Sequence, residues 1–496
     1  MMNAKTKNPF ERFLNLFTEV HAGEGTNALL LALNIFLIFT SYYIMKPVRE
    51  ALILSGGFGE LSGAVVKSLT AAGQVILLMG AIPLYAKIAS RVPRRRLINV
   101  VTIFFACCLA LFYILALSKV PLGVIFYLWI GIFNLMLPAQ LWAFSNDLYT
   151  PEAGKRIFVI IGIGASLGAA LGGIITKVLI APLGIYQLLL LAGGLLLLSL
   201  IITNIIDSRE KSQSMIKKQQ TPDEPFGKKG AFQLVLKNKY LLMIAFLIFF
   251  LNWVNTTGEY ILGQTVENTA KQEVQTSHVQ EEAASHSMEK LKSEEPDNEA
   301  LAAVDTFDQL NMTDRARATV HADEYKSDWV KEYIASFYSI FYTGVNILGL
   351  VLQLFIVSRI LKYAGIRIAM FILPLVALVG YFFIIFFPIL TIIRWAKTAE
   401  NGTDYSLQNT VRHILFLPTT REEKYKAKQA IDTFFWRAGD LLSAALVLLG
   451  TTLLSFQTKH FALFNVGLII IWLILAFGIG RENKKLTADQ TNDELK

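Results

Sequence analysis

The chain has 496 residues, of which 54% are hydrophobic and only 17% are charged, and its mean hydropathy is +0.48. This composition excludes a soluble multidomain enzyme and predicts an all-α protein that crosses a membrane many times. The net charge of +8 does not require a nucleic-acid partner, because the basic residues collect in short segments between apolar runs, where membrane orientation accounts for them. Cys107 and Cys108 are adjacent inside an apolar run. This suits neither a disulfide framework nor a metal site, and we expect no metal and no cofactor.

The first apolar run ends in a group of charges. It begins near Ala28, and by Met45 it has the roughly 20 residues that span a bilayer. Lys46, Arg49 and Glu50 follow. Charges at this depth usually face a bundle interior or a water-filled cavity, so we interpret them as candidates for a permeation pathway. The alternative is that the two basic side chains extend to the lipid headgroups.

Five further segments of the first half are apolar enough to form membrane helices. One of them has Pro151 at its start, a position where proline is favoured. The same helix carries Gly164, Gly168 and Gly172 at four-residue spacing, a pattern that lets two membrane helices approach closely. The predicted segments cover about residues 61–89, 97–117 and 121–149, a helix from 151 onward, and 186–206.

A polar, basic linker at 207–230 precedes the second half, which contains a long polar insertion. Residues 264–332 hold 16 acidic and 7 basic residues with almost no apolar periodicity. We therefore expect an extramembrane insertion that is either helical or disordered. The tenth helix is unusually polar, and it either borders a wet cavity or is interrupted near Asn401–Gly402. The six helices predicted in this half cover about 241–262 and then begin near 333, near 366, after 388, near 418 and near 461.

The distribution of lysine and arginine predicts how the helices are oriented. Basic residues collect in alternate short loops, so both termini and the linker are expected on the cytoplasmic side and the insertion outside. The two halves also resemble each other weakly, since 46–53 can be laid on 255–262, which brings Glu50 and Glu259 together. We predict two six-helix bundles with a central site between them. The predicted parts are residues 1–206, the linker 207–230, and 231–496 interrupted by 264–332.

Basic side chains near the ends of several helices favour an anionic substrate. Convergent arginine and lysine suit a phosphate or a polycarboxylate, although for loop residues the orientation rule accounts for the charge equally well. The sequence has no glycine-rich loop ending in Gly-Lys-Ser or Gly-Lys-Thr, so ATP hydrolysis is not indicated and we do not expect an enzyme. The basic candidates, and an acidic residue one turn further on, are Lys46, Arg49, Lys155, Arg156, Arg421, Lys424, Lys428 and Asp432.

Three segments of the chain, 43–52, 142–166 and 423–432, resemble the bacterial and plastid type ATP/ADP translocases. The resemblance implies a twelve-helix carrier, similar in architecture to major facilitator transporters, that exchanges nucleotides across a membrane. The positions that look like matches to functional residues of that family are Lys46, Arg49, Glu50, Asn146, Lys155, Asn252, Lys424, Lys426, Lys428 and Asp432.

The sequence departs from the family pattern at three places in the helices, and the insertion 264–332 has no counterpart in that pattern. Arg49-Glu50-Ala51-Leu52 stands where members carry Lys-Asp-Thr-Leu. Asn255 stands where they carry a carboxylate, so Glu259 is a candidate from the residues alone. The pair 439–440 is Gly-Asp where they carry Gly-Lys.

Three hypotheses remain open from the sequence. The first is a monomeric carrier of a bacterial inner membrane that exchanges nucleotides of the ATP/ADP type through a central basic cavity by alternating access. In this hypothesis Glu50 and Glu259 balance the charge of the cavity. The second is a proton-coupled carrier of another organic anion, with one of these two carboxylates as the proton site. The third is a non-transporting membrane protein that binds a partner through the acidic insertion.

Overall fold

The computed structural model describes residues 24–89, 92–148, 151–213, 231–294, 307–420, 423 and 427–494. Most of these residues form helices and none of them forms a strand, although Phe58 and Leu61 make an isolated β-bridge. The all-α prediction is therefore confirmed. Eleven helices in the described part of the chain are long and apolar enough to cross a membrane, and the polar tenth segment lies between two of them.

The helices of the first half pack around a central one. The helix α2 (Gly25–Leu54) contacts α5, α6 and α7, and most of its residues are buried. It continues through Pro47, so the span does not end near Met45 and the three charges lie inside the helix. The other helices of this half are α3 (Gly63–Ala89), α4 (Arg94–Leu117), α5 (Gly123–Leu148), α6 (Pro151–Leu183) and α7 (Gln187–Gln213).

The glycine pattern of α6 has the predicted packing role. A Cβ atom added at Gly164 or Gly168 would lie 2.4 Å from a backbone oxygen of α2, and one added at Gly172 would lie 2.6 Å from another. Real Cβ atoms do not approach backbone this closely, so only glycine permits this contact between the two helices. Pro151 is the first residue of α6, as predicted.

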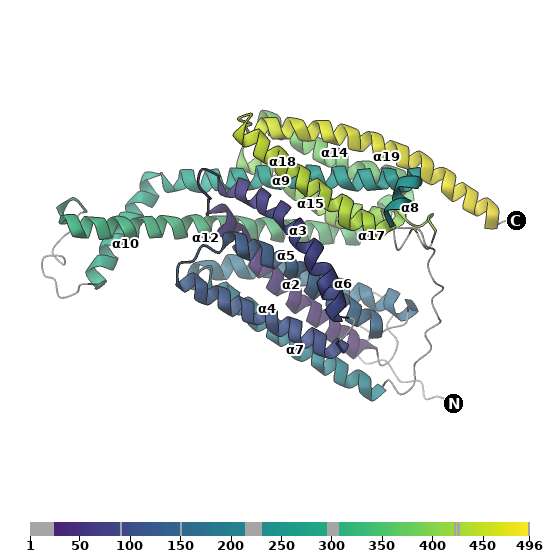
Figure 1. Ribbon diagram of the computed structural model, residues 1–496, viewed down its shortest axis with the longest axis horizontal. Helices are drawn as coiled ribbons and strands as arrows, with labels where there is room; N and C mark the ends of the chain where they lie inside the picture. The colour runs from purple at the N-terminus through teal and green to yellow at the C-terminus, as the bar shows by residue number, and fades with distance from the viewer. Residues whose placement is uncertain are drawn as a thin grey trace.

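The second half contains longer and less regular helices, and Figure 1 shows it as a second bundle beside the first. Three of its segments include π-helical turns, labelled here η3, η4 and η6. The elements are α8 (Ala231–Lys237), α9 (Lys239–Val274), α10 (Ser277–Glu294), η2 (Phe307–Gln309), α12 (Met312–Leu352), η3 (Gln353–Val357), α13 (Ser358–Tyr363), α14 (Gly365–Phe386), α15 (Leu390–Thr403), η4 (Asp404–Gln408), α16 (Asn409–Leu415), α17 (Lys428–Ala430), η6 (Ile431–Phe435), α18 (Trp436–Thr452) and α19 (Thr458–Glu494).

The described part of the insertion is helical, and two of the membrane helices extend into it. The helix α9 runs on to Val274, and α12 begins at Met312, so the predicted helix starts and ends near 262 and 333 are wrong. The polar composition indicates where the chain leaves the apolar layer, but the helices extend beyond that point. Their ends are set by capping residues instead. Asn311 provides that cap for α12, because its side chain accepts a hydrogen bond from the Asp314 N–H at 2.9 Å. Figure 1 shows α10 and the extended helices projecting from the bundles. Partner binding by the insertion stays a prediction.

Contacts between the two halves gather at the insertion end. The Glu267 carboxylate of α9 is fully buried and accepts hydrogen bonds from the Gly63 and Ala64 N–H groups at 3.1 and 2.8 Å. These groups lie at the N-terminus of α3, where a negative charge is favoured. Lys119 forms an ion pair with Glu324 at 2.9 Å nearby. Figure 1 shows the bundles meeting near the insertion and diverging toward the termini.

Replacing the buried carboxylate by Glu267→Gln should weaken this contact. The amide oxygen accepts from one N–H group, but the amide nitrogen cannot accept from the other, and an unpaired buried donor costs about 1–3 kcal/mol. We expect a population with a longer distance between spin labels at Ser118 and Thr276, measured by pulsed electron paramagnetic resonance in a background without the native cysteines. Glu273→Gln, on an exposed part of α9, is the control. Identical distance distributions in the two variants would contradict this role of the carboxylate.

Candidate functional site

A cavity of about 380 Å³ lies between the two halves. Residues of α2, α3 and α5 line it from the first half, and residues of α9, α12, η4 and α18 line it from the second. The polar tenth segment contributes Asp404 and Tyr405, which confirms that it borders a cavity. It is not broken at Asn401–Gly402, because α15 continues to Thr403 and passes directly into the π-helical turn η4.

The first-half wall is organised around Glu50. This carboxylate has no exposed surface, and it is bonded by Arg49, by the Lys67 ammonium at 2.7 Å and by the Tyr342 hydroxyl at 3.1 Å. Tyr342 comes from α12, so the cluster joins the two halves. Arg49 also lies over the Tyr127 ring, 4.6 Å from its centroid. Two cations and a hydroxyl therefore compensate one buried charge, as a carboxylate in this environment requires.

Sequence reasoning missed Lys67. It is the only charged residue between Gly63 and Tyr85, and a lone charge in an apolar segment is the signal that could have identified it. Its side chain lines the cavity.

Lys46 lines the cavity without a carboxylate partner among the described residues. Its ammonium lies 3.8 Å from the centroid of the Tyr342 ring and 5.2 Å from that of Tyr43. Ring faces stabilise a cation by about 0.5–2 kcal/mol, which is less than a desolvated charge needs. This lysine is thus the cation of the first-half wall best placed to meet an anion.

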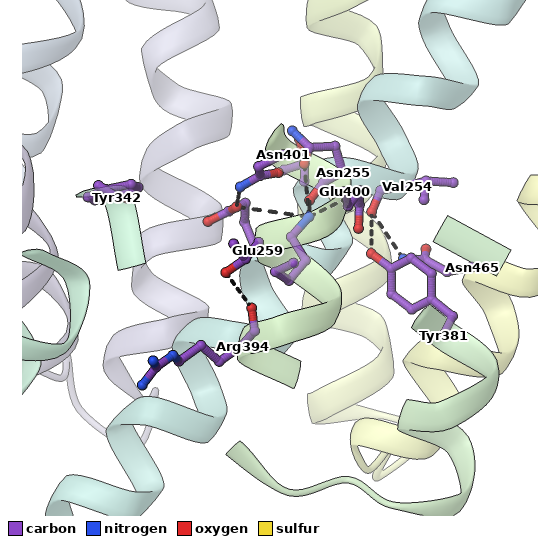
Figure 2. A network of polar contacts seen from close by, with 12 residues as sticks. Val254, Asn255, Glu259, Tyr342, Tyr381, Arg394, Glu400, Asn401 and Asn465 are labelled. Carbon is purple, nitrogen blue, oxygen red and sulfur yellow. Dashed lines mark hydrogen bonds and ion pairs between the residues drawn. The ribbon is translucent and has the colours of Figure 1, made fainter. Parts of the chain in front are cut away.

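The second-half wall contains a buried network centred on Lys397, which is 1% exposed. Its ammonium donates to the Asn255 side-chain oxygen at 2.9 Å and pairs with Glu400 at 3.0 Å and with Glu259 at 3.9 Å. Figure 2 shows Asn255, Glu259, Glu400 and Asn401 converging on this centre. Asn401 donates to Glu259 at 2.9 Å. The network fixes Glu259 at the cavity, where it remains 22% exposed.

A second polar group on this wall surrounds Asp440. Asn252 donates to its carboxylate at 2.7 Å, Thr256 donates at 2.8 Å, and Arg437 pairs with it at 3.2 Å. The Asn252 amide also donates to the Trp436 carbonyl oxygen at 2.7 Å. Asp440 of α18 thus joins this helix to α9.

The other predicted site residues do not line the cavity or lie outside the described side chains. Lys428 of α17 pairs with Asp432 of η6 at 2.7 Å, and neither lines the cavity. Asn146 and Lys155 lie on α5 and α6, but their side chains are outside the description, as is the whole of Lys424. The structure therefore brings together the predicted residues Lys46, Arg49, Glu50, Asn252 and Glu259 around the cavity.

Comparisons with known proteins agree with this architecture. Residues 31–265 match the Major Facilitator Superfamily. No curated protein sequence matches the chain. Similar solved structures include a bacterial homologue of the iron transporter ferroportin in an inward-facing state, with 12% identity, a TM-score of 0.57, and 92% of this chain and 98% of that chain covered.

Two further structures have a similar fold. The nucleoside transporter NupG is 13% identical with a TM-score of 0.54, and 91% of this chain and 98% of that chain are covered. The human organic anion transporter MFSD10 is 12% identical with a TM-score of 0.52, and 92% of this chain and 99% of that chain are covered. At this identity the likeness concerns the fold alone. The chain is thus a multi-pass membrane protein with the fold of major facilitator transporters.

Proposed function

We propose that the chain is an alternating-access carrier that takes a nucleotide into the central cavity and exchanges it for another nucleotide. The observation that carries the proposal is Lys46, which faces the cavity without a carboxylate partner in the described part of the chain. An intramembrane charge costs about 3 kcal/mol or more unless water or a partner compensates it. A phosphate that arrives in the cavity supplies such a partner.

The lining supports distinct roles for its residues. Lys46 and Arg49 would pair with phosphate oxygens, and Lys67 would hold Glu50 in place behind them. Tyr405 and Trp436 offer planar side chains on the other wall, on which a base could stack.

The resemblance to ATP/ADP translocases adds residues outside the cavity. We assign Lys428 and Asp432 to the access path near the termini, because α17 and η6 lie on the side where the bundles diverge. With cytoplasmic termini, as the distribution of basic residues predicts, the cavity of this conformation faces the cytoplasm of a bacterial cell.

Exchange in reconstituted vesicles tests the proposal. Vesicles loaded with ADP should take up labelled ATP in a saturable manner, and Lys46→Gln should lower uptake by about tenfold or more, since a hydrogen bond to a charged group contributes about 1.5–3 kcal/mol. Arg49→Gln should have a similar effect. Lys485→Gln, which neutralises an exposed lysine of α19, is the control. The proposal fails if ATP uptake does not require internal nucleotide, or if both cavity variants transport at the wild-type rate.

A second candidate function is proton-coupled transport of another organic anion. This candidate is favoured because each half holds a carboxylate next to the cavity and close to a buried lysine. Glu50 of the first half pairs with Lys67, and Glu259 of the second half lies near Lys397. Protonation of such a carboxylate would free its cation for the substrate, and this couples proton binding to anion binding.

An imposed pH gradient distinguishes the two candidates. Under the second one, an inward proton gradient should drive uptake of an organic anion into vesicles that contain no counter-substrate, and Glu259→Gln or Glu50→Gln should abolish the effect of the gradient. Uptake that depends on internal nucleotide and is equal with and without a gradient would exclude proton coupling.

A further inference from the structure

The two walls of the cavity carry opposite charge. The charged residues that line it from the first half are Lys46, Arg49 and Lys67, all of them basic. The charged residues that line it from the second half are Glu259, Asp404, Asp440 and Arg437, so that carboxylates exceed cations there. A guest that fills the cavity therefore meets positive charge on one side and negative charge on the other.

Most of these charged groups already have partners within the protein. The groups that can still bind a guest are again a cation on the first-half wall and carboxylates on the second-half wall. On the first-half wall, Arg49 and Lys67 are bonded to Glu50. Lys46 is the cation of this wall that has no carboxylate partner among the described residues. On the second-half wall, the Asp440 carboxylate accepts from three side chains and has little capacity left.

Asp404 and Glu259 are the acceptors that remain on the second-half wall. Asp404 is 7% exposed, and its Oδ1 atom has no hydrogen-bond partner in the described part of the chain. Glu259 is held by Asn401 and is only loosely paired with Lys397 at 3.9 Å. A buried acceptor without a donor costs about 1–3 kcal/mol, which a donor on the guest would remove.

Charges behind the lining do not reverse this polarity. Lys397 and Glu400 form a buried pair and cancel each other. Arg412 lies over the Trp436 ring at 4.6 Å, outside the lining. Even with Arg412 added to Arg437, the second-half wall has three carboxylates against two cations.

We infer that the cavity selects an amphoteric substrate, with an anionic group at Lys46 and an amino, amide or hydroxyl donor at Asp404 and Glu259. The inference rests on the carrier function proposed above, but it does not require the substrate to be a nucleotide. For a nucleotide it sets the direction of binding, with the phosphates toward α2 and the donor groups of the base or sugar toward η4 and α9. A compact anion without donors would pair with Lys46, but the carboxylates of the opposite wall would repel it.

Two matched pairs of probes test the inference through their binding to the purified full-length protein. ATP is compared with tripolyphosphate, and phosphotyramine with phenyl phosphate, because the members of each pair share the anionic group and differ in the donor-bearing part. Affinity is measured from the rise of the unfolding temperature with ligand concentration. We expect the amphoteric member of at least one pair to bind about tenfold or more tightly than its partner.

Variants of the second-half wall identify the residues responsible. Asp404→Asn and, separately, Glu259→Gln should weaken binding of the amphoteric probe and strengthen binding of the simple anion. The ratio of their two affinities should then fall to within about threefold. Glu281→Gln removes an exposed carboxylate of α10 and should leave the preference unchanged. The unfolding temperature without ligand shows whether each variant is folded, and the two variants provide independent tests.

The possible outcomes separate this inference from the nucleotide proposal. If phosphotyramine is preferred over phenyl phosphate but ATP does not bind, the nucleotide proposal fails and the amphoteric site stands. If the simple anions bind as tightly as their partners, or the preference survives in both variants, the inference is overturned while an anion carrier remains. Absence of binding by all four probes would overturn both.

Discussion

The structure depends on the compensation of one buried carboxylate, that of Glu50. It lies in the middle of the protein, where Arg49 of its own helix, Lys67 of α3 and Tyr342 of α12 all bond to it. Replacing one partner of a buried ion pair leaves the other uncompensated, which typically costs about 3–5 kcal/mol. The same residue therefore places two cations at the cavity and holds the second half against the first.

The charges of the cavity are close to balanced, which differs from the expectation of a basic cavity. A net positive cavity within an apolar layer would be costly without its guest, because each uncompensated charge must be solvated. The chain avoids most of that cost by pairing Lys67 and Lys397 with carboxylates from other helices or from the next turn. Lys46 is held by aromatic rings instead. The affinity for an anion is thus concentrated at one side chain, and the carboxylates of the opposite wall can contribute selectivity.

The closure at the insertion end complements this arrangement. Glu267 binds the N-terminus of α3, the helix that also carries Lys67. A movement of α3 away from α9 at that end would thus displace a residue of the cavity wall. The contact between α3 and α9 at the insertion end is therefore physically connected to the position of Lys67 at the cavity wall.

Much of the fold follows from sequence patterns that report local physics. The length of the apolar runs predicted the membrane helices, and the glycine spacing of α6 predicted a close helix contact, which the structure forms with α2. The polarity of the tenth segment predicted either a place at a cavity or an interruption, and the structure has the first. The start of α12 was predicted wrongly, because polarity reports the edge of the apolar layer whereas Asn311 sets the helix end.

The site was only partly predictable because it is assembled from distant segments. Intramembrane charge identified Lys46, Arg49 and Glu50, but Tyr342 is an ordinary tyrosine in an apolar helix, and only the packing of α12 against α2 brings it to Glu50. Lys428 and Asp432 were candidates because they lie one helical turn apart in a segment that resembles the ATP/ADP translocases. The same spacing also produces the local ion pair that they form outside the cavity lining.

The most direct test of the account is a structure of the full-length protein with ATP, determined by electron cryomicroscopy in a lipid nanodisc. We predict density in the cavity between α2 and η4, with the phosphates in contact with Lys46 and its ammonium moved from the Tyr342 ring toward them. A cavity without ligand density at a nucleotide concentration that saturates binding, with ATP located elsewhere on the protein, would contradict it.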